Sequence, residues 1–146
     1  MKKTILFVVA AFTLSAGVFA ATGETPDHAL LSFEKHFAGA KDVTWENDAA
    51  GFRKATFVWG GHRTIAYYTT EGELAGTARG LFFAQVPMSV SRAFYRNFEK
   101  AIVLDVKEIT NSEGTRYLIL MEQKNKKYRT TINNYGEVVK TEKLKK

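Results

Sequence analysis

Two stretches of this sequence resemble two others further along the chain, and this internal similarity restricts the possible folds more than any other feature. Residues 69–79 align with residues 133–143 at an offset of 64, so that Gly72 matches Gly136 and Glu73 matches Glu137. An earlier match, at an offset of 61, pairs Pro26, Phe33 and Phe37 with Pro87, Phe94 and Phe98. Because both matches come in the same order, we interpret them as a duplication of one structural unit.

The first copy is predicted to open with a helix. Thr25 can cap the free amide groups at its start, and Pro26 has the fixed φ that suits a first helical position. Leu30, Phe33 and Phe37 then fall on one face. A helix with one apolar face needs a sheet to cover, so we expect strands to follow.

The second copy repeats this arrangement. Pro87 can begin a helix on which Val90, Phe94 and Phe98 lie at i, i+4 and i+8. The segment between the copies, 80–86, carries Leu81, Phe82 and Phe83 and is predicted to be a buried connection.

The remainder of each copy is predicted to be four short antiparallel strands. In the first copy the strands run roughly over 42–46, 52–59, 62–68 and 73–79, and in the second over 102–109, 116–122, 128–133 and 137–142. Gly60-Gly61 is a strong hairpin signal, since tight hairpin turns need positive φ; the turn in the second copy is predicted at 124–126. The predicted fold is therefore α+β, a tandem repeat of helix plus four-stranded antiparallel sheet with the two sheets side by side. The repeats are assigned to residues 21–80 and 81–146.

Strand alternation predicts which side chains face away from the helices. Closing the hairpin at Gly60-Gly61 pairs Trp59 with His62 and places Ala55 and Phe57 on the helix side. The repeat adds the second-copy residues, which gives the candidate protein-binding face as Lys54, Arg63, Ile65, Tyr67, Leu118 and Leu120. Two leucines left in water would forgo roughly 1.5 to 3 kcal/mol each, so we expect the other sheet, the 81–83 connection or a partner to cover them.

The first twenty residues have the layout of a secretory signal peptide. Lys2 and Lys3 precede an apolar run that ends near small residues, and Val18 with Ala20 suits signal peptidase. We expect cleavage after Ala20 and a periplasmic or secreted product without a transmembrane segment. Cleavage of residues 1–20 lowers Lys+Arg from 21 to 19 against 15 acids, a net charge of +4. The absence of cysteine excludes disulfides, thiol nucleophiles and thiolate metal sites.

Short motifs spread over most of the chain resemble a known family. These are Val43-x-Trp45, the strand containing Phe57, Ala66-Tyr67-Tyr68, Glu71-Gly72-Glu73-Leu74, Val86-Pro87 and Tyr135-Gly136-Glu137-Val138. They resemble exported bacterial PepSY-like proteins, which are related in architecture to the beta-lactamase inhibitory protein. The resemblance implies tandem helix-plus-four-strand repeats and an inhibitory or protein-binding role, with no established reaction.

The search for catalytic and metal-binding patterns favours structural explanations. His28 and His36 can share a helix face, but no third metal ligand is suggested. No Gly-x-Ser-x-Gly motif and no phosphate-binding glycine loop occurs. We therefore predict no enzyme activity, no cofactor, no metal and no nucleic acid.

The preferred function is a non-catalytic periplasmic protein-binding or inhibitory module whose partner is an unidentified envelope or extracellular protein. The alternative is a protein that binds a small ligand or an envelope polyanion, the latter through the basic clusters Lys124, Lys126, Lys127 and Arg129 and the tail Lys140, Lys143, Lys145 and Lys146. A carrier would need an enclosed apolar cavity, whereas a protein-binding module needs an open sheet face.

Overall fold

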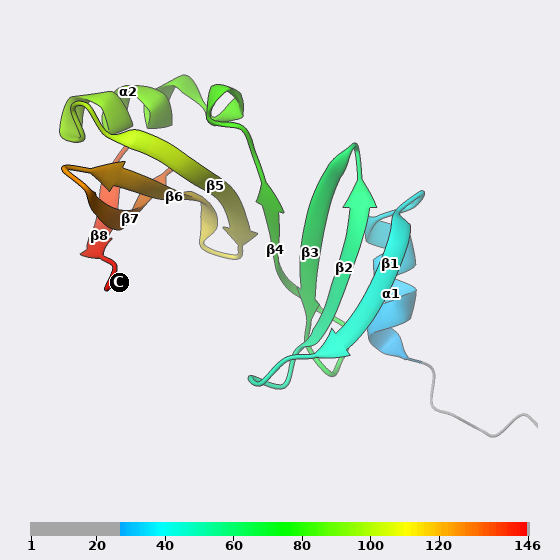
Figure 1. Cartoon of the computed structure of the whole chain (residues 1–146). Coiled ribbons are helices and arrows are strands. Elements are labelled where there is room, and N and C mark those ends of the chain that lie inside the picture. The colour runs from blue at the N-terminus through cyan, green and yellow to red at the C-terminus, as the bar shows by residue number, and fades with distance from the viewer. Residues whose placement is uncertain (1–26, 146) are drawn as a thin grey trace, which may run out of the picture.

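The computed structural model describes residues 27–145, which form two α-helices, one short 3-10 helix and eight strands (Figure 1). Their order is α1 (His28–His36), β1 (Lys41–Asn47), β2 (Arg53–Trp59), β3 (His62–Tyr68), β4 (Leu74–Gly80), η1 (Phe83–Gln85), α2 (Met88–Asn97), β5 (Ile102–Asn111), β6 (Gly114–Gln123), β7 (Lys126–Asn133) and β8 (Val138–Lys143). The predicted signal peptide lies outside the described residues. All eight strands form one antiparallel sheet, in the order β1 to β8.

The sheet is continuous at its centre, where β4 pairs with β5 from Gly76↔Asn111 to Gly80↔Lys107. The prediction of two sheets side by side, each four-stranded, is therefore wrong, whereas the α+β class and the antiparallel strands are correct. The sequence predicts both β4 and β5 as strands. Alternation of side chains within a strand does not, however, show which other strand it pairs with. Joining β4 to β5 satisfies backbone groups that two separate sheets would have left at their edges.

The ends of the helices differ from the prediction. Asp27 caps α1, because its Oδ1 accepts hydrogen bonds from the amides of Ala29 at 3.1 Å and Leu30 at 3.3 Å. The predicted cap, Thr25, and Pro26 lie outside the described residues. Pro87 stands one position before α2 rather than at its first turn.

The two central hairpins turn through residues with positive φ. In β2–β3 the predicted register is confirmed, with Trp59 opposite His62, and Gly60 and Gly61 have φ of +56° and +81°. In β6–β7 the turn consists of Lys124 and Asn125, with φ of 52° and 58°, and β7 begins at the next residue. Positive φ at both central residues matches the twist of the strands, as expected for a two-residue hairpin loop.

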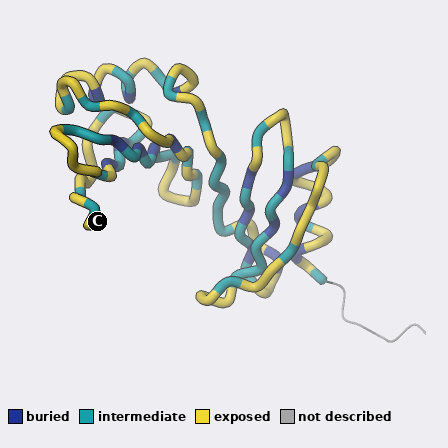
Figure 2. The backbone as a smooth tube through the Cα atoms, viewed as in Figure 1, coloured by how far each residue is buried: buried dark blue, intermediate teal, exposed yellow. Residues whose placement is uncertain are grey.

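Each helix covers one half of the sheet and has its own core, and Figure 2 shows buried segments in both halves. Beneath α1, Phe33 and Phe37 pack against Phe57, with ring centroids 4.8 and 4.7 Å from its ring. This first core consists of Ala29, Phe33, Phe37, Ala55, Phe57, Ala66 and Tyr68. The second consists of Val86, Val90, Ala93, Phe94, Val106, Tyr117, Ile119, Met121 and Ile132, with Phe98 packed against it.

The connection between β4 and α2 is only partly buried. Leu81 and Phe83 pack against the second core, on the side of the sheet that carries α2. Phe82, however, is 79% exposed, so its predicted burial is wrong. The cause is local: the amide of Phe82 donates to Oε1 of Gln85 at 2.8 Å, and the short 3-10 turn that follows directs Phe83, not Phe82, toward the core.

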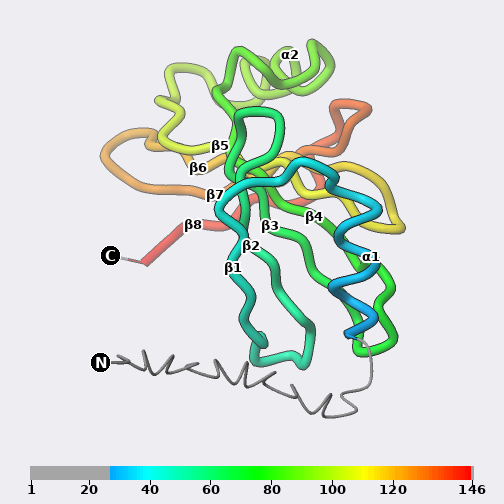
Figure 3. Tube along the Cα trace, turned by 90° about the vertical axis from the view of Figure 1, so that its right-hand side faces the viewer, coloured from blue at the N-terminus to red at the C-terminus, as the bar shows by residue number. Residues whose placement is uncertain are grey.

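Both helices lie on the same side of the sheet, because directly opposed residues in an antiparallel pair point to the same face. Through the β4–β5 pairing, the side of β3 that carries buried Ala66 continues to the side of β5 that carries buried Val106. Figures 1 and 3 show the sheet bending along β4, with α2 over one half and α1 over the other, both outside the bend. Among residues 27–145, no helix lies on the opposite side of the sheet.

Tyr68 should make stability fall at high pH. Burial raises the pKa of this fully buried phenol from 10 to about 12, so the unfolded chain loses the proton at lower pH than the folded protein. Stability from this group is complete below pH 10 and is lost as pH rises from 10 toward 12. We expect the free energy of unfolding of Tyr68→Phe to fall less steeply over that window than that of the native chain. Urea denaturation of both proteins at matched pH measures the difference. Parallel declines would contradict the assignment.

Candidate protein-binding face

The open face is defined here as the side of the sheet opposite α1 and α2. Strand neighbours of the predicted residues, such as Ala55, Ala66 and Ile119, are fully buried under the helices, so the residues between them point to the other side. The structure brings all six predicted residues onto this one face of one sheet: Lys54, Arg63, Ile65, Tyr67, Leu118 and Leu120. Arg63 is exposed and the other five are partly buried.

An apolar row crosses the bend on the open face. Ile65 on β3 stands opposite Ala78 on β4, and Ala78 stands opposite Ile109 on β5. Ile109 is 36% exposed, and Ile65 and Ala78 are partly buried. These residues link the open faces of the two halves, and no helix of the described part of the chain covers them.

A second row, next to the apolar one, carries two cations. Thr64 pairs with Arg79, and continuing that register by one residue places Arg63 beside Gly80. Gly80 in turn pairs with Lys107, which stands opposite Leu118 on β6. The two cations therefore flank a residue with no side chain.

A third row contains Tyr67. This residue lies between Lys54 on β2 and Gly76 on β4, and Gly76 stands opposite Asn111. Lys54 Nζ makes a salt bridge with Glu46 Oε1 at 2.6 Å, and this hydrogen bond raises the pKa of the ammonium group. Lys54 is thus already paired within the chain, unlike Arg63 and Lys107, which take part in none of the salt bridges found within residues 27–145.

The helix side of the same junction is polar. Arg79 Nε donates to Glu108 Oε1 at 2.7 Å, and Tyr117 Oη donates to Glu108 Oε2 at 3.2 Å. Burial, and then the Glu108 charge, raise the pKa of Tyr117. Where the halves join, an ion pair therefore lies on the helix side and the apolar row of Ile65, Ala78 and Ile109 on the open side, the reverse of the arrangement in each core.

In the apolar row and the row with the two cations, three side chains were not predicted: Ala78, Lys107 and Ile109. They lie on β4 and β5, whose pairing was missed because the sequence was divided into two sheets. A usable signal exists in β5, since Lys107 and Ile109 alternate with Val106 and Glu108, and Val106 is buried in the second core. That alternation would have assigned both residues to the open face.

The histidines are placed by packing. The ring of His36 stacks on Tyr68 at 6.1 Å, and its Nδ1 lies 3.3 Å from the phenol oxygen. His62 stands opposite Trp59, whose ring packs edge-on against Phe37. Among residues 27–145 no group of three or more His, Cys, Asp or Glu side chains is placed to hold a metal ion.

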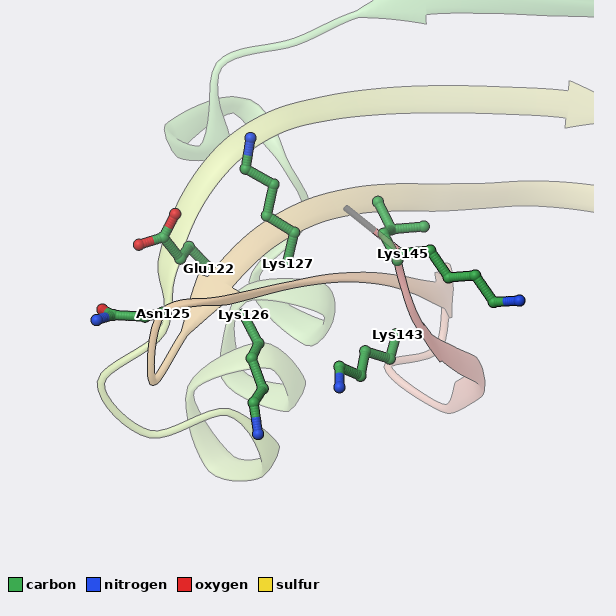
Figure 4. A pocket seen from close by; sticks show the side chains of 7 residues that line it. Glu122, Asn125, Lys126, Lys127, Lys143 and Lys145 are labelled. Atoms are coloured by element: carbon green, nitrogen blue, oxygen red, sulfur yellow. The ribbon is translucent and has the colours of Figure 1, made fainter.

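A basic hollow lies at the start of β7 and the end of β8, where the two predicted lysine clusters meet (Figure 4). Its lining consists of Glu122, Asn125, Lys126, Lys127, Lys143, Leu144 and Lys145. Figure 4 shows Lys126 and Lys143 extending to one side of the ribbon and Lys127 to the other, so these ammonium groups do not converge on one point. Arg129 and Lys140 both contact Glu142, whose pKa is lowered chiefly by Lys140.

An apolar hollow lies between α1 and β1 and is lined by Leu30, Phe33, Glu34, Phe37, Ala38, Gly39, Ala40, Val43 and Trp45. Phe33 and Phe37 form its base and belong to the first core. In the described part of the chain, neither helix is long and apolar enough to cross a membrane.

Several solved structures share this fold, and three of them are described below. A protein from Bacteroides eggerthii, named provisionally as periplasmic, has a TM-score of 0.73 and 25% identity over 83% of this chain and 90% of its own. A DUF2874 family protein from Bacteroides ovatus has a TM-score of 0.74 and 22% identity over 82% of this chain and 88% of its own. A BLIP-like protein from Bacteroides fragilis has a TM-score of 0.73 and 19% identity over 84% of this chain and 90% of its own.

No protein-family model and no curated protein matches the sequence. The names of the three structural neighbours contain no catalytic term. The similarity extends over most of both chains in each comparison, which fits the resemblance drawn from the sequence motifs. The chain therefore has the BLIP-like architecture, with two helices on one side of an eight-stranded antiparallel sheet.

Proposed function

We propose that this protein is an exported, non-catalytic binding module that holds another protein against its open face. The observation that carries this proposal is the inverted junction between the two halves. Ile65, Ala78 and Ile109 lie on the side without helices, while Arg79 and Glu108 form an ion pair on the helix side. Apolar side chains on an otherwise uncovered face are typical of interaction surfaces.

The chemistry of the open face supports a protein partner. Protein interfaces place aromatic and aliphatic anchors at the centre and charged groups at the rim. Here the aromatic and aliphatic anchors are Ile65 and Tyr67 on β3 and Leu118 on β6. The charged groups beside them are Arg63, near the start of β3, and Lys54 on the neighbouring β2. The connection at 81–83, which had been a candidate cover for the leucines, packs on the other side.

Export to the periplasm is part of this proposal. The N-terminal signal-peptide pattern predicts cleavage after Ala20, and the Bacteroides eggerthii neighbour bears a periplasmic name. N-terminal sequencing of the mature protein should begin at Ala21. Recovery of the chain with Met1 in a membrane fraction would contradict export with cleavage.

The proposal is tested by Tyr67→Ser and Leu118→Ser, made singly. Both side chains are partly buried, so each change should lower the free energy of unfolding by only about 1 kcal/mol. We expect each to abolish retention of a protein that the native chain captures from a periplasmic extract. The captured protein is then purified, and its affinity for the native chain and the variants is measured directly.

Tyr95→Ser and Leu31→Ser are matched controls. Their side chains are 66% and 49% exposed on the helices, away from the open face. They should leave the affinity unchanged. If they weaken binding as much as the open-face changes, the face is wrongly assigned. A large fall in melting temperature for Tyr67→Ser or Leu118→Ser would show that these residues belong to a core.

A further inference from the structure

From the charges on the open face we infer that the partner presents an acidic segment with an apolar side chain beside its carboxylate. This inference rests on the proposed function and names the chemistry of the partner. It places the carboxylate between Arg63 and Lys107, above Gly80, and the apolar side chain on the neighbouring row formed by Ile65, Ala78 and Ile109.

The two cations are well spaced for one anionic group. Arg63 and Lys107 lie on β3 and β5, two strand spacings apart, which is roughly 9.5 Å between backbones. The sheet bends along β4 with the open face on its inner side (Figure 1), so long side chains from the two strands can incline toward each other. Gly80 contributes no side chain between them, and a Cβ atom built there meets nothing within 4 Å.

Neither cation is neutralised within the described chain. Most other cations of the open face have an acidic contact: Lys54 with Glu46, Arg116 with Glu113, and both Arg129 and Lys140 with Glu142. Arg63 and Lys107 are exposed and form no salt bridge within residues 27–145. A partner carboxylate would therefore gain charge-assisted hydrogen bonds without breaking an existing pair.

The charges also favour one occupant over its competitors. A second copy of this chain would present the same two unpaired cations, and the chain expected after removal of residues 1–20 carries a net charge of +4. A uniformly charged polymer would leave Ile65 and Ile109 without an apolar partner. An acidic protein segment with an aliphatic or aromatic residue satisfies both rows at once.

The test uses a displayed library of random peptides selected against the purified protein, since the natural partner need not be known. We expect the selected peptides to combine Asp or Glu with a large apolar residue. Their affinity for the native chain should fall as salt rises. Arg63→Gln and Lys107→Gln should each weaken binding about tenfold, because each removes a charge-assisted hydrogen bond.

The control variant is Arg92→Gln, which removes one cation from the exposed surface of α2, as each open-face change removes one from the open face. It should leave peptide affinity unchanged. This inference would be wrong if the selected peptides lacked an acidic bias and yet bound the Leu118→Ser variant more weakly than the native chain. That result would still support the open face as the binding surface. Peptides insensitive to every open-face substitution, or a library that yields no binder, would count against both.

Discussion

Replacing Phe57 by alanine should lower the free energy of unfolding by about 3–5 kcal/mol, the usual cost of removing a buried phenyl ring. Phe57 is 1% exposed, and its ring is enclosed by Phe33 and Phe37. Phe33 lies on α1 and Phe37 is its C-cap, so the helix fixes both neighbouring rings and the cavity cannot close fully. Urea denaturation followed by circular dichroism measures the loss.

The adjacent residue supplies the control. Val58 lies on the open face of the same strand and is partly exposed, so Val58→Ala should cost no more than about 1.5 kcal/mol. Equal losses for Phe57→Ala and Val58→Ala would show that β2 does not alternate between core and open face. That result would also undermine the placement of Lys54, which shares the face of Val58.

A substitution in the second core tests whether the two halves of the sheet unfold as one unit. Both tryptophans, Trp45 and Trp59, lie in the first half, so their fluorescence reports unfolding of that half. Because β4 pairs with β5 through five residue pairs, we expect the halves to unfold together. Phe94→Ala, in the second core, should then lower the urea midpoint seen by tryptophan fluorescence. An unchanged fluorescence midpoint would mean that the halves unfold independently.

The sequence predicted local structure well because local patterns determine it. The register of β2–β3 follows from Gly60-Gly61 alone, since a two-residue turn with positive φ fixes every pair along the hairpin. Alternation along the strands then assigned Phe57 to the core and Tyr67 to the open face. The same reasoning placed Ile119 in the second core and its neighbour Leu118 on the open face of the sheet.

The error at the centre of the sheet has a different origin. The β4–β5 pairing joins two strands that are separated in the chain by η1 and α2. It is made by backbone hydrogen bonds, and nearly every residue type can form these, so the sequence contains no pattern that predicts it. The residues that seal the helix side of this junction, Arg79 and Glu108, resemble ordinary surface charges until they are seen 2.7 Å apart. The open face was therefore predicted in part: the six predicted residues lie on it, whereas the central Ala78, Lys107 and Ile109 were missed.

Replacing Gly136 by alanine should also destabilise the protein strongly, by about 3 kcal/mol or more. Gly136 has φ of +87°, and a Cβ atom built on it would lie 2.6 Å from the carbonyl oxygen of Ser89. The turn between β7 and β8 is held at the start of α2, because Ser89 Oγ donates to the carbonyl oxygen of Asn134 at 2.8 Å. Gly72 makes the corresponding approach to His28, with its Cβ position 2.6 Å from backbone carbon.

A matched glycine separates the two causes of this loss. Gly60 also has positive φ, but a Cβ atom there meets nothing within 4 Å, so Gly60→Ala carries only the conformational cost of roughly 1–2 kcal/mol. The loss of unfolding free energy for Gly136→Ala and Gly72→Ala beyond that for Gly60→Ala measures how tightly each turn between strands is packed on its helix. Equal losses at all three positions, in urea denaturation, would show that the helices can shift away from the turns. An excess at both would show that each helix is fixed to the sheet at its first turn, which keeps both helices on one side and leaves the other side free for a partner.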